Sequence, residues 1–105
     1  MTTRKLGPWD VFHIGLGCMN VSWPRGAAVE EETRRASATP GIQAGLDEGV
    51  TLLDTADIYA PAWNKVGHNE EFVAQALSTW EADPARKKKV LIATKGGITR
   101  SDGEK

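Results

Sequence analysis

The sequence predicts an α/β protein built around a small parallel sheet. Two short apolar runs, residues 50–53 and 90–94, lack any alternation of polar and apolar side chains, which is typical of strands buried on both faces. Helical patterns precede the first run and separate it from the second, and strands that alternate with helices form right-handed βαβ units. We therefore expect the order hairpin, strand, helix, strand, helix, strand.

Composition narrows the functional classes. The chain has 105 residues, which is room for one small domain, and its 13 basic and 14 acidic side chains give a formal net charge of −1. Because this balance lacks the basic bias of nucleic-acid-binding proteins, no nucleic-acid partner is predicted. The apolar runs are far shorter than the roughly 20 residues that span a bilayer, and no apolar stretch follows the charged N-terminus as in a secretory signal. No membrane association is predicted either.

The single cysteine, Cys18, bears on metal binding and on location. One thiol can form neither an internal disulfide nor a cysteine-based zinc site, so no metal is predicted. A chain without a disulfide is typical of the reducing cytosol, and we expect a cytoplasmic protein. Nothing near Cys18 indicates an activated thiolate.

An antiparallel hairpin begins the predicted fold. Residues 2–6 and 11–16 form its strands, and the spacer at 7–10 contains Gly, Pro and Asp, which are turn formers. A loop is predicted at residues 24–26.

The first helical pattern consists of two parts. Charge pairs at i,i+4 spacing over residues 30–35 indicate a solvated helical turn. Thr39 and Pro40 then start the helix anew, with a capping side chain followed by proline at the first helical position. Gly49 lies where a left-handed C-terminal residue is expected.

The second helical pattern begins at Asn69, which is predicted to cap the helix ahead of an acidic first turn. Its apolar stripe includes Trp80, and residues 83–84 end it. The basic run at 86–89 precedes the last strand, so it is expected to be a solvated loop on the side of the sheet away from the strands' carboxyl ends.

Polar or flexible segments follow each predicted strand of the parallel sheet, at residues 15–20, 54–59 and 94–97. In parallel α/β folds, functional groups lie at these carboxyl ends. Gly15 and Gly17 do not form a dinucleotide fingerprint, because Asn20 occupies the position of the third glycine. From the residues alone, close packing or a tight bend explains the two glycines.

Asp54 and Lys95 each end an apolar strand, where an unpaired charge would be costly. Neighbouring strands lie about 4.8 Å apart, so the two side chains can pair. Two interpretations remain open. The pair is either a structural ion pair at the carboxyl end of the sheet or part of a site with Tyr59. The second interpretation is possible because an ammonium lowers the pKa of a nearby phenol below about 10. Such a phenol can act as a general acid towards a carbonyl oxygen.

Three motifs, in this order, resemble the aldo/keto reductase family: LDTADIY at 53–59, GHNEE at 67–71 and ATK at 93–95. GLGCM at 15–19 is also similar to the first strand and turn of that family. The resemblance implies an eight-stranded (β/α) TIM barrel whose bottom is closed by a plug hairpin. The chain would then be the N-terminal part of that barrel: the plug β-hairpin, the first three parallel strands and two helices. Residues 1–105 would form a partial NADP-dependent oxidoreductase domain, truncated after the third barrel strand.

The resemblance also implies a function, the NADPH-dependent reduction of aldehydes or ketones to alcohols by hydride transfer. The substrate would be a small carbonyl compound. Tyr59 would be the proton donor, Lys95 would lower its pKa, and Asp54 would hold Lys95. The residues implied to line the nicotinamide and its ribose are Gly17, Cys18, Met19 and Asp54.

Some parts of the family pattern are missing. The catalytic His of the family lies at the end of the next strand, only ten residues follow Lys95, and the strands that bind the adenosine phosphate are absent. Residues 60–61 are Ala-Pro, where the family usually has Gly after the tyrosine. We therefore expect the 105-residue chain alone to be inactive and not to bind NADPH with micromolar affinity.

Two alternatives belong to other functional classes. One is a truncated or non-catalytic relative that retains the motifs. The other is a small interaction protein that pairs through an exposed strand edge, and self-association through the strand at 90–94 is expected for such a chain.

Overall fold

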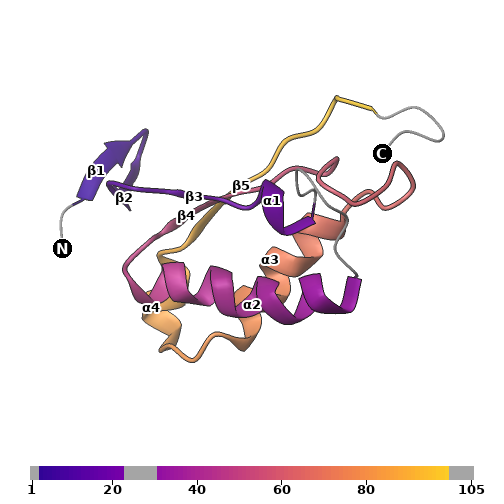
Figure 1. The fold of residues 1–105 in the computed structure, drawn as a ribbon. Helices are drawn as coiled ribbons and strands as arrows, with labels where there is room; N and C mark the ends of the chain where they lie inside the picture. The colour runs from indigo at the N-terminus through magenta and orange to yellow at the C-terminus, as the bar shows by residue number, and fades with distance from the viewer. Residues whose placement is uncertain (1–2, 23–30, 100–105) are drawn as a thin grey trace.

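The computed structural model describes residues 3–22 and 31–99 and contains a hairpin, a parallel sheet and helices (Figure 1). The hairpin strands form a sheet of their own, and the three remaining strands follow one another in sheet order as they do along the chain, as predicted. The elements are β1 (Thr3–Leu6), β2 (Trp9–Phe12), β3 (Leu16–Gly17), α1 (Met19–Ser22), α2 (Glu31–Asp47), β4 (Leu52–Asp54), α3 (His68–Thr79), α4 (Pro84–Lys88) and β5 (Leu91–Ala93).

The three-stranded sheet is parallel throughout, which confirms the predicted parallel arrangement. The prediction that the last strand is buried on both faces is wrong, because β5 lies at the edge of the sheet and its last two residues are exposed. Gly17, Asp54 and Ala93 form one row across its carboxyl end. Leu53, the middle residue of β4, is 0 % exposed and belongs to the core beneath the helices. Because side chains alternate along a strand, Asp54 points to the opposite face.

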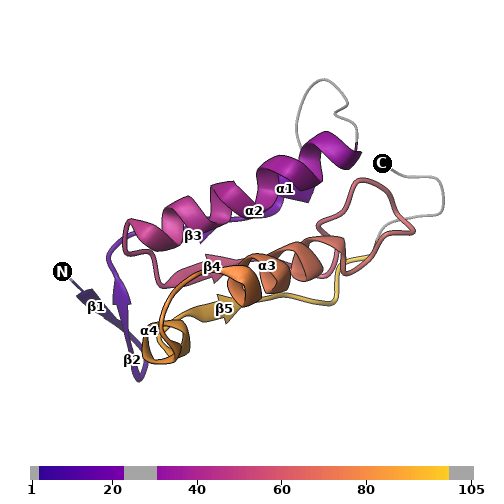
Figure 2. The ribbon, with the colours of Figure 1, turned by 90° about the horizontal axis from the view of Figure 1, so that it is seen from below.

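Helices α2 and α3 lie side by side on one face of the sheet (Figures 1 and 2). The core fills the space between these helices and β4, as expected for elements that each bury one apolar face. Trp80 belongs to this core, as its spacing predicts, and its indole Nε1 donates a hydrogen bond of 2.8 Å to Asp47 Oδ1. The core residues are Cys18, Ile42, Leu46, Val50, Leu53, Val73, Ala76 and Trp80.

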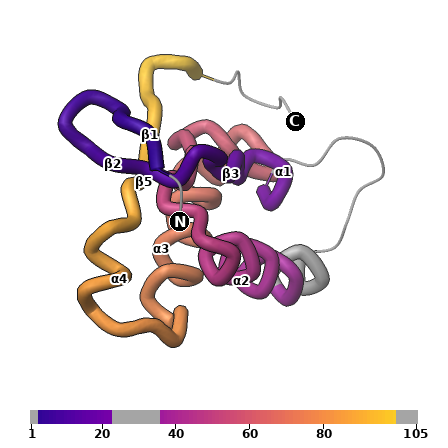
Figure 3. The backbone as a smooth tube through the Cα atoms, turned by 90° about the vertical axis from the view of Figure 1, so that its left-hand side faces the viewer, coloured from indigo at the N-terminus to yellow at the C-terminus, as the bar shows by residue number. Residues whose placement is uncertain are grey.

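The hairpin forms as predicted, but its second strand and its turn are displaced. β2 begins at Trp9, which pairs with Leu6, so the turn contains only residues 7–8. Gly7 has φ 58°, a left-handed conformation that glycine adopts without steric cost. Because a two-residue loop brings the strands together sooner, Trp9 enters the ladder. Residues 13–16, which were predicted to continue the hairpin strand, lie outside it, and Leu16 begins β3. The hairpin is tied to β4 by Phe12 N, which donates to Thr51 Oγ1 at 2.9 Å, and Figure 3 shows it nearest the viewer.

The predicted break in the first helix at Pro40 is wrong, because α2 continues through this proline. Ala38, Ile42 and Leu46 recur at a spacing of four and are all buried. A single helix places all three side chains in the core, and this tertiary packing outweighs the hydrogen bond that proline cannot donate. Gly49, at φ 110°, follows the helix as predicted.

Replacing this proline should stabilise the chain. Pro40 is exposed, so Pro40→Ala removes little packing while it restores a helical N–H donor. We expect the free energy of unfolding in urea to rise by about 2–2.5 kcal/mol, which is the interior cost of proline less its benefit in the unfolded chain. Gly41→Ala, the matched control, should add only about 0.5–1 kcal/mol through propensity. A smaller gain for Pro40→Ala than for Gly41→Ala would contradict this account.

The segment before the last strand also differs from the prediction. Asp83 accepts a hydrogen bond from Arg86 N and so caps a short helix, α4, where a stop and a loop were predicted. Arg86 is not merely solvated, because it lies over the Trp80 ring at 4.8 Å and donates to Leu46 O at 3.0 Å near the end of α2. The basic run does precede β5, at the end of the sheet opposite Lys95, as expected (Figure 1).

β5 lies at one edge of the sheet, and its Ile92 is 46 % exposed. Self-association through this edge stays a prediction. Within the described residues, no helix is both long and apolar enough to cross a membrane.

Candidate active site

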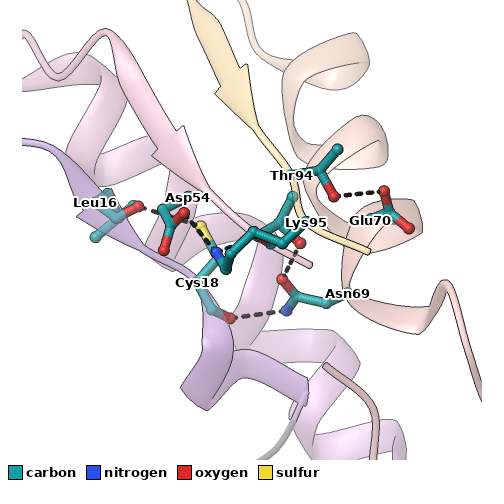
Figure 4. A network of polar contacts seen from close by, with 8 residues as sticks. Leu16, Cys18, Asp54, Asn69, Glu70, Thr94 and Lys95 are labelled. Carbon is teal, nitrogen blue, oxygen red and sulfur yellow. Dashed lines mark hydrogen bonds and ion pairs between the residues drawn. The ribbon is translucent and has the colours of Figure 1, made fainter. Parts of the chain in front are cut away.

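Asp54 and Lys95 form an ion pair at the carboxyl end of the sheet (Figure 4). Lys95 lies two residues beyond Ala93, the register partner of Asp54, so both side chains emerge on the same face. Lys95 Nζ is 2.7 Å from Asp54 Oδ1 and donates a second hydrogen bond, of 2.8 Å, to Thr55 O. The predicted pairing is confirmed. The two side chains are 48 % and 49 % exposed, so a bound molecule could reach both.

The surroundings of Lys95 favour its charged form. A hydrogen bond with the Asp54 carboxylate raises the pKa of Lys95 above its usual value, partial burial opposes this, and a hydrogen bond with Tyr59 adds to the rise. The ammonium is therefore retained throughout the neutral range.

Tyr59 lies beside the same ammonium, with Lys95 Nζ 5.1 Å from the centre of the ring. The backbone holds this position from both sides. Tyr59 N donates to Ala56 O at 3.3 Å, and Asn69 N in the first turn of α3 donates to Tyr59 O at 3.1 Å. A purely structural ion pair leaves the direction of Tyr59 unspecified, whereas here the phenol and the cation meet.

The turn after β3 borders this group. Gly17 pairs with Asp54, and a Cβ added to Gly17 would meet no atom within 4 Å, so the space beside Gly17 is open. An open backbone beside an accessible carboxylate suits a sugar hydroxyl and a flat ring, and the residues present fit the ribose and nicotinamide of a dinucleotide. Met19, half-buried, begins α1 on the same turn. Gly15 behaves differently, because an added Cβ would be in van der Waals contact with Leu52, at 3.4 Å.

Cys18 turns its side chain away from the open space. The thiol is 1 % exposed, and burial, with the negative charge of Asp54 as the second cause, raises its pKa to about 11. It is therefore protonated at neutral pH and is no nucleophile. Cys18 N donates to Asp54 O at 2.9 Å, which fixes the turn to β4.

The predicted role of Asn69 as a helix cap is wrong. α3 begins at His68, its N-cap is Gly67 at φ 89°, and no side chain caps it. Asn69 is instead fully buried and bonds to residues of two other segments. Asn at the start of an acidic first turn is typical of a cap, and nothing in the spacing indicates that this amide faces inward.

Other polar contacts near the site are peripheral to it. Thr94 Oγ1 donates to Glu70 Oε2 at 2.8 Å, which joins the end of β5 to α3 (Figure 4). Of the two histidines, His68 contacts Ser22 Oγ at 2.7 Å through Nδ1, and His13 packs against Phe12 in the hairpin.

Trp63 is in the loop before α3, and Trp23 lies outside the described residues. The described part of the chain contains no cluster of three side chains that could hold a metal.

Comparison with known proteins identifies the family. The Aldo/keto reductase family profile matches residues 13–105. The chain is 33 % identical over 96 residues to a protein of Novosphingobium aromaticivorans named 6-dehydroglucose reductase, a match that covers 90 % of this chain and 29 % of that protein. It is 30 % identical over 99 residues to an aldo-keto reductase of Schizosaccharomyces pombe, yakc, whose name carries NADP(+); 94 % of this chain and 25 % of that protein are covered.

A solved structure agrees with these sequence matches. The holo form of aldo-keto reductase AKR11C1 from Bacillus halodurans superposes with a TM-score of 0.61 at 31 % identity, covering 99 % of this chain and 28 % of that one. The parallel sheet and its helices thus match part of an aldo-keto reductase barrel, and this chain spans less than a third of the length of each relative. The chain belongs to the aldo/keto reductase family of oxidoreductases.

Proposed function

We propose that this chain supplies the proton-donating side of an NADPH-dependent reduction of aldehydes or ketones, within a barrel completed by further strands. The observation that carries the proposal is the meeting of Tyr59, Lys95 and Asp54 at one end of the sheet. In this arrangement Tyr59 passes its phenolic proton to the carbonyl oxygen, and Lys95 stabilises the tyrosinate that remains. Asp54 holds Lys95 in place and keeps it charged.

When bound, NADPH supplies the hydride that reduces the carbonyl carbon. Gly17 and Asp54 would hold its ribose and nicotinamide, because one leaves open space and the other offers a carboxylate to the sugar hydroxyls. The name of the S. pombe relative supports NADP(H) as the cofactor. A phenol beside a lysine that is charged at neutral pH supports carbonyl compounds as substrates.

The proposal is tested in a hybrid reductase in which residues 1–105 replace the matching part of the S. pombe relative. We expect the hybrid to consume NADPH when an aldehyde is added. Tyr59→Phe keeps the ring and removes only the hydroxyl, so it should lower kcat by about 10²–10⁴-fold, the usual range for general acid catalysis, with NADPH binding retained. The rate is followed by NADPH absorbance, and binding by NADPH fluorescence.

Trp63→Phe is the matched control, because it alters an aromatic side chain of the same loop without touching a charged group. It should leave kcat within a few-fold of the parent hybrid. A folded hybrid that reduces aldehydes equally well with Phe at position 59 would refute the proposal.

A further inference from the structure

We infer that Asn69 is a positioning residue that fixes the turn at Gly17–Met19 relative to Lys95 through its buried side-chain amide. The inference rests on the proposed function, since it concerns how the two halves of that site are held together. Asn69 touches neither the phenol nor the open space beside Gly17, so its role is exerted through the residues that it binds.

Every hydrogen-bonding group of the Asn69 side chain is in use, and Figure 4 shows its bond to Cys18. Its Oδ1 accepts a hydrogen bond from Thr55 Oγ1. Its two N–H groups donate to Cys18 O at 2.7 Å and to Ser22 Oγ at 2.9 Å. A primary amide offers two donors and one carbonyl acceptor, and all are satisfied in a fully buried position. Such saturation gives one arrangement a clear advantage over its alternatives, because any displacement leaves a buried polar group unpaired.

These bonds join the segments that carry the proposed site. Cys18 lies between Gly17 and Met19, and Ser22 ends α1, so two bonds hold both ends of the turn after β3. The third bond reaches Thr55, and the carbonyl of that same residue accepts a hydrogen bond from Lys95 Nζ. Asn69 therefore connects the turn to the lysine through a single intervening residue.

The backbone of Asn69 extends the connection to the proton donor. Asn69 N donates to Tyr59 O at 3.1 Å, so one residue at the start of α3 contacts the turn, the strand end and the loop of the phenol. Hydride and proton transfer to one carbonyl need donors placed to within a fraction of an ångström, and a displaced turn would separate them. We conclude that Asn69 sets the spacing between the cofactor turn and the proton donor.

Cys18 provides the measurement, because it is the only cysteine in the sequence and its thiol is buried in the turn that Asn69 holds. The rate at which Ellman's reagent modifies this thiol in the 105-residue chain reports the opening of the turn, with no cofactor present. Asn69→Leu keeps the approximate volume and removes all three bonds. We expect labelling at least about tenfold faster than in the parent chain, as for the loss of one or two net hydrogen bonds. The increase in labelling rate over the parent chain should be independent of urea concentration, because it arises from local opening of the turn.

Gln43→Leu is the matched control. Gln43 also donates two side-chain amide hydrogen bonds, to Ala76 O at 2.9 Å and Thr79 Oγ1 at 3.0 Å, but these join α2 to α3 away from the site. In Gln43→Leu, the rate of Cys18 labelling should change only through global unfolding and should therefore rise steeply with urea. If Asn69→Leu fails to fold, Thr55→Val and Ser22→Ala each remove a single bond to the amide, and each should produce a smaller, urea-independent acceleration.

Two further outcomes separate this inference from the proposed function. Tyr59→Phe, which tests the proton donor, should leave Cys18 labelling unchanged, so an inactive proton donor would not affect the result for Asn69. In the hybrid reductase, Asn69→Leu should raise KM for NADPH more than tenfold, whereas Gln43→Leu should not. Two results would overturn the inference. One is that Cys18 in Asn69→Leu is labelled no faster than the loss of global stability alone predicts. The other is that Cys18 in the single-bond variants is labelled at the parent rate.

Discussion

Lys95→Met in the hybrid reductase is expected to lower kcat by about 10²–10⁴-fold, as much as removal of the proposed proton donor, Tyr59. Methionine retains the length of the side chain but not its charge, so nothing would stabilise the tyrosinate left at Tyr59 after proton transfer. Asp54 would at the same time lose its partner, and its unopposed charge beside the phenol would further disfavour the anion. Steady-state rates with an aldehyde at saturating NADPH measure the effect.

The pH dependence separates this role from simple packing. The pKa of Lys95 is raised above its usual value, so the ammonium persists through the neutral and mildly alkaline range and is lost only above it. In the parent hybrid, kcat should therefore fall at alkaline pH as Lys95 loses its proton. The residual activity of Lys95→Met should show no such fall. Lys88→Met on α4, at the opposite end of the sheet, serves as control and should retain the parent rate. Equal rates for the two variants would exclude Lys95 from proton transfer.

Leu53→Ala should have the largest effect on stability, a loss of about 2–5 kcal/mol in the free energy of unfolding. Leu53 is fully buried at the centre of β4, between two neighbouring strands and beneath both long helices, so its removal leaves a cavity with no route to collapse. A domain of this length has only about 5–15 kcal/mol of stability in total. In urea titrations monitored by tryptophan fluorescence, the urea concentration at the unfolding midpoint should therefore be much lower for Leu53→Ala than for the parent chain.

Leu6→Ala in the hairpin is the corresponding control, because Leu6 is largely exposed and loses little contact on truncation. It should change the free energy of unfolding by less than about 1 kcal/mol. A loss of similar size at both positions would mean that β4 is not the centre of the core.

The sheet was predictable from sequence because its signals are local. Unalternating apolar runs at 50–53 and 90–94 indicate strands buried on both faces, and the charged residue that ends each strand must find a partner at the same edge. The ion pair of Asp54 and Lys95 follows from those two facts. From the residues alone the approach of Tyr59 was one of two open interpretations, because an irregular loop of eight residues separates it from α3, and the likeness to a family favoured it.

The missed features depend on tertiary structure. Pro40 lies within α2 because Ala38, before the proline, and Ile42 and Leu46, after it, all pack in the core when the helix is continuous, a gain that no local pattern shows. The inward position of Asn69 depends on partners up to 51 residues away in the chain. Short α4 was missed because its Asp-Pro start is equally typical of a chain reversal.

The order of strands in the sheet has a consequence for synthesis on the ribosome. β3, β4 and β5 are neighbours in space in the order in which they are translated, so each strand can add to an edge that the preceding strand has already formed. Translation proceeds at about 5–20 residues per second, far more slowly than helices and short strand pairs form. Asp54 ends β4, and Tyr59 and Lys95 follow β4 and β5 within a few residues. The nascent polypeptide can thus bring the phenol, the ammonium and the carboxylate together as soon as β5 has joined the sheet.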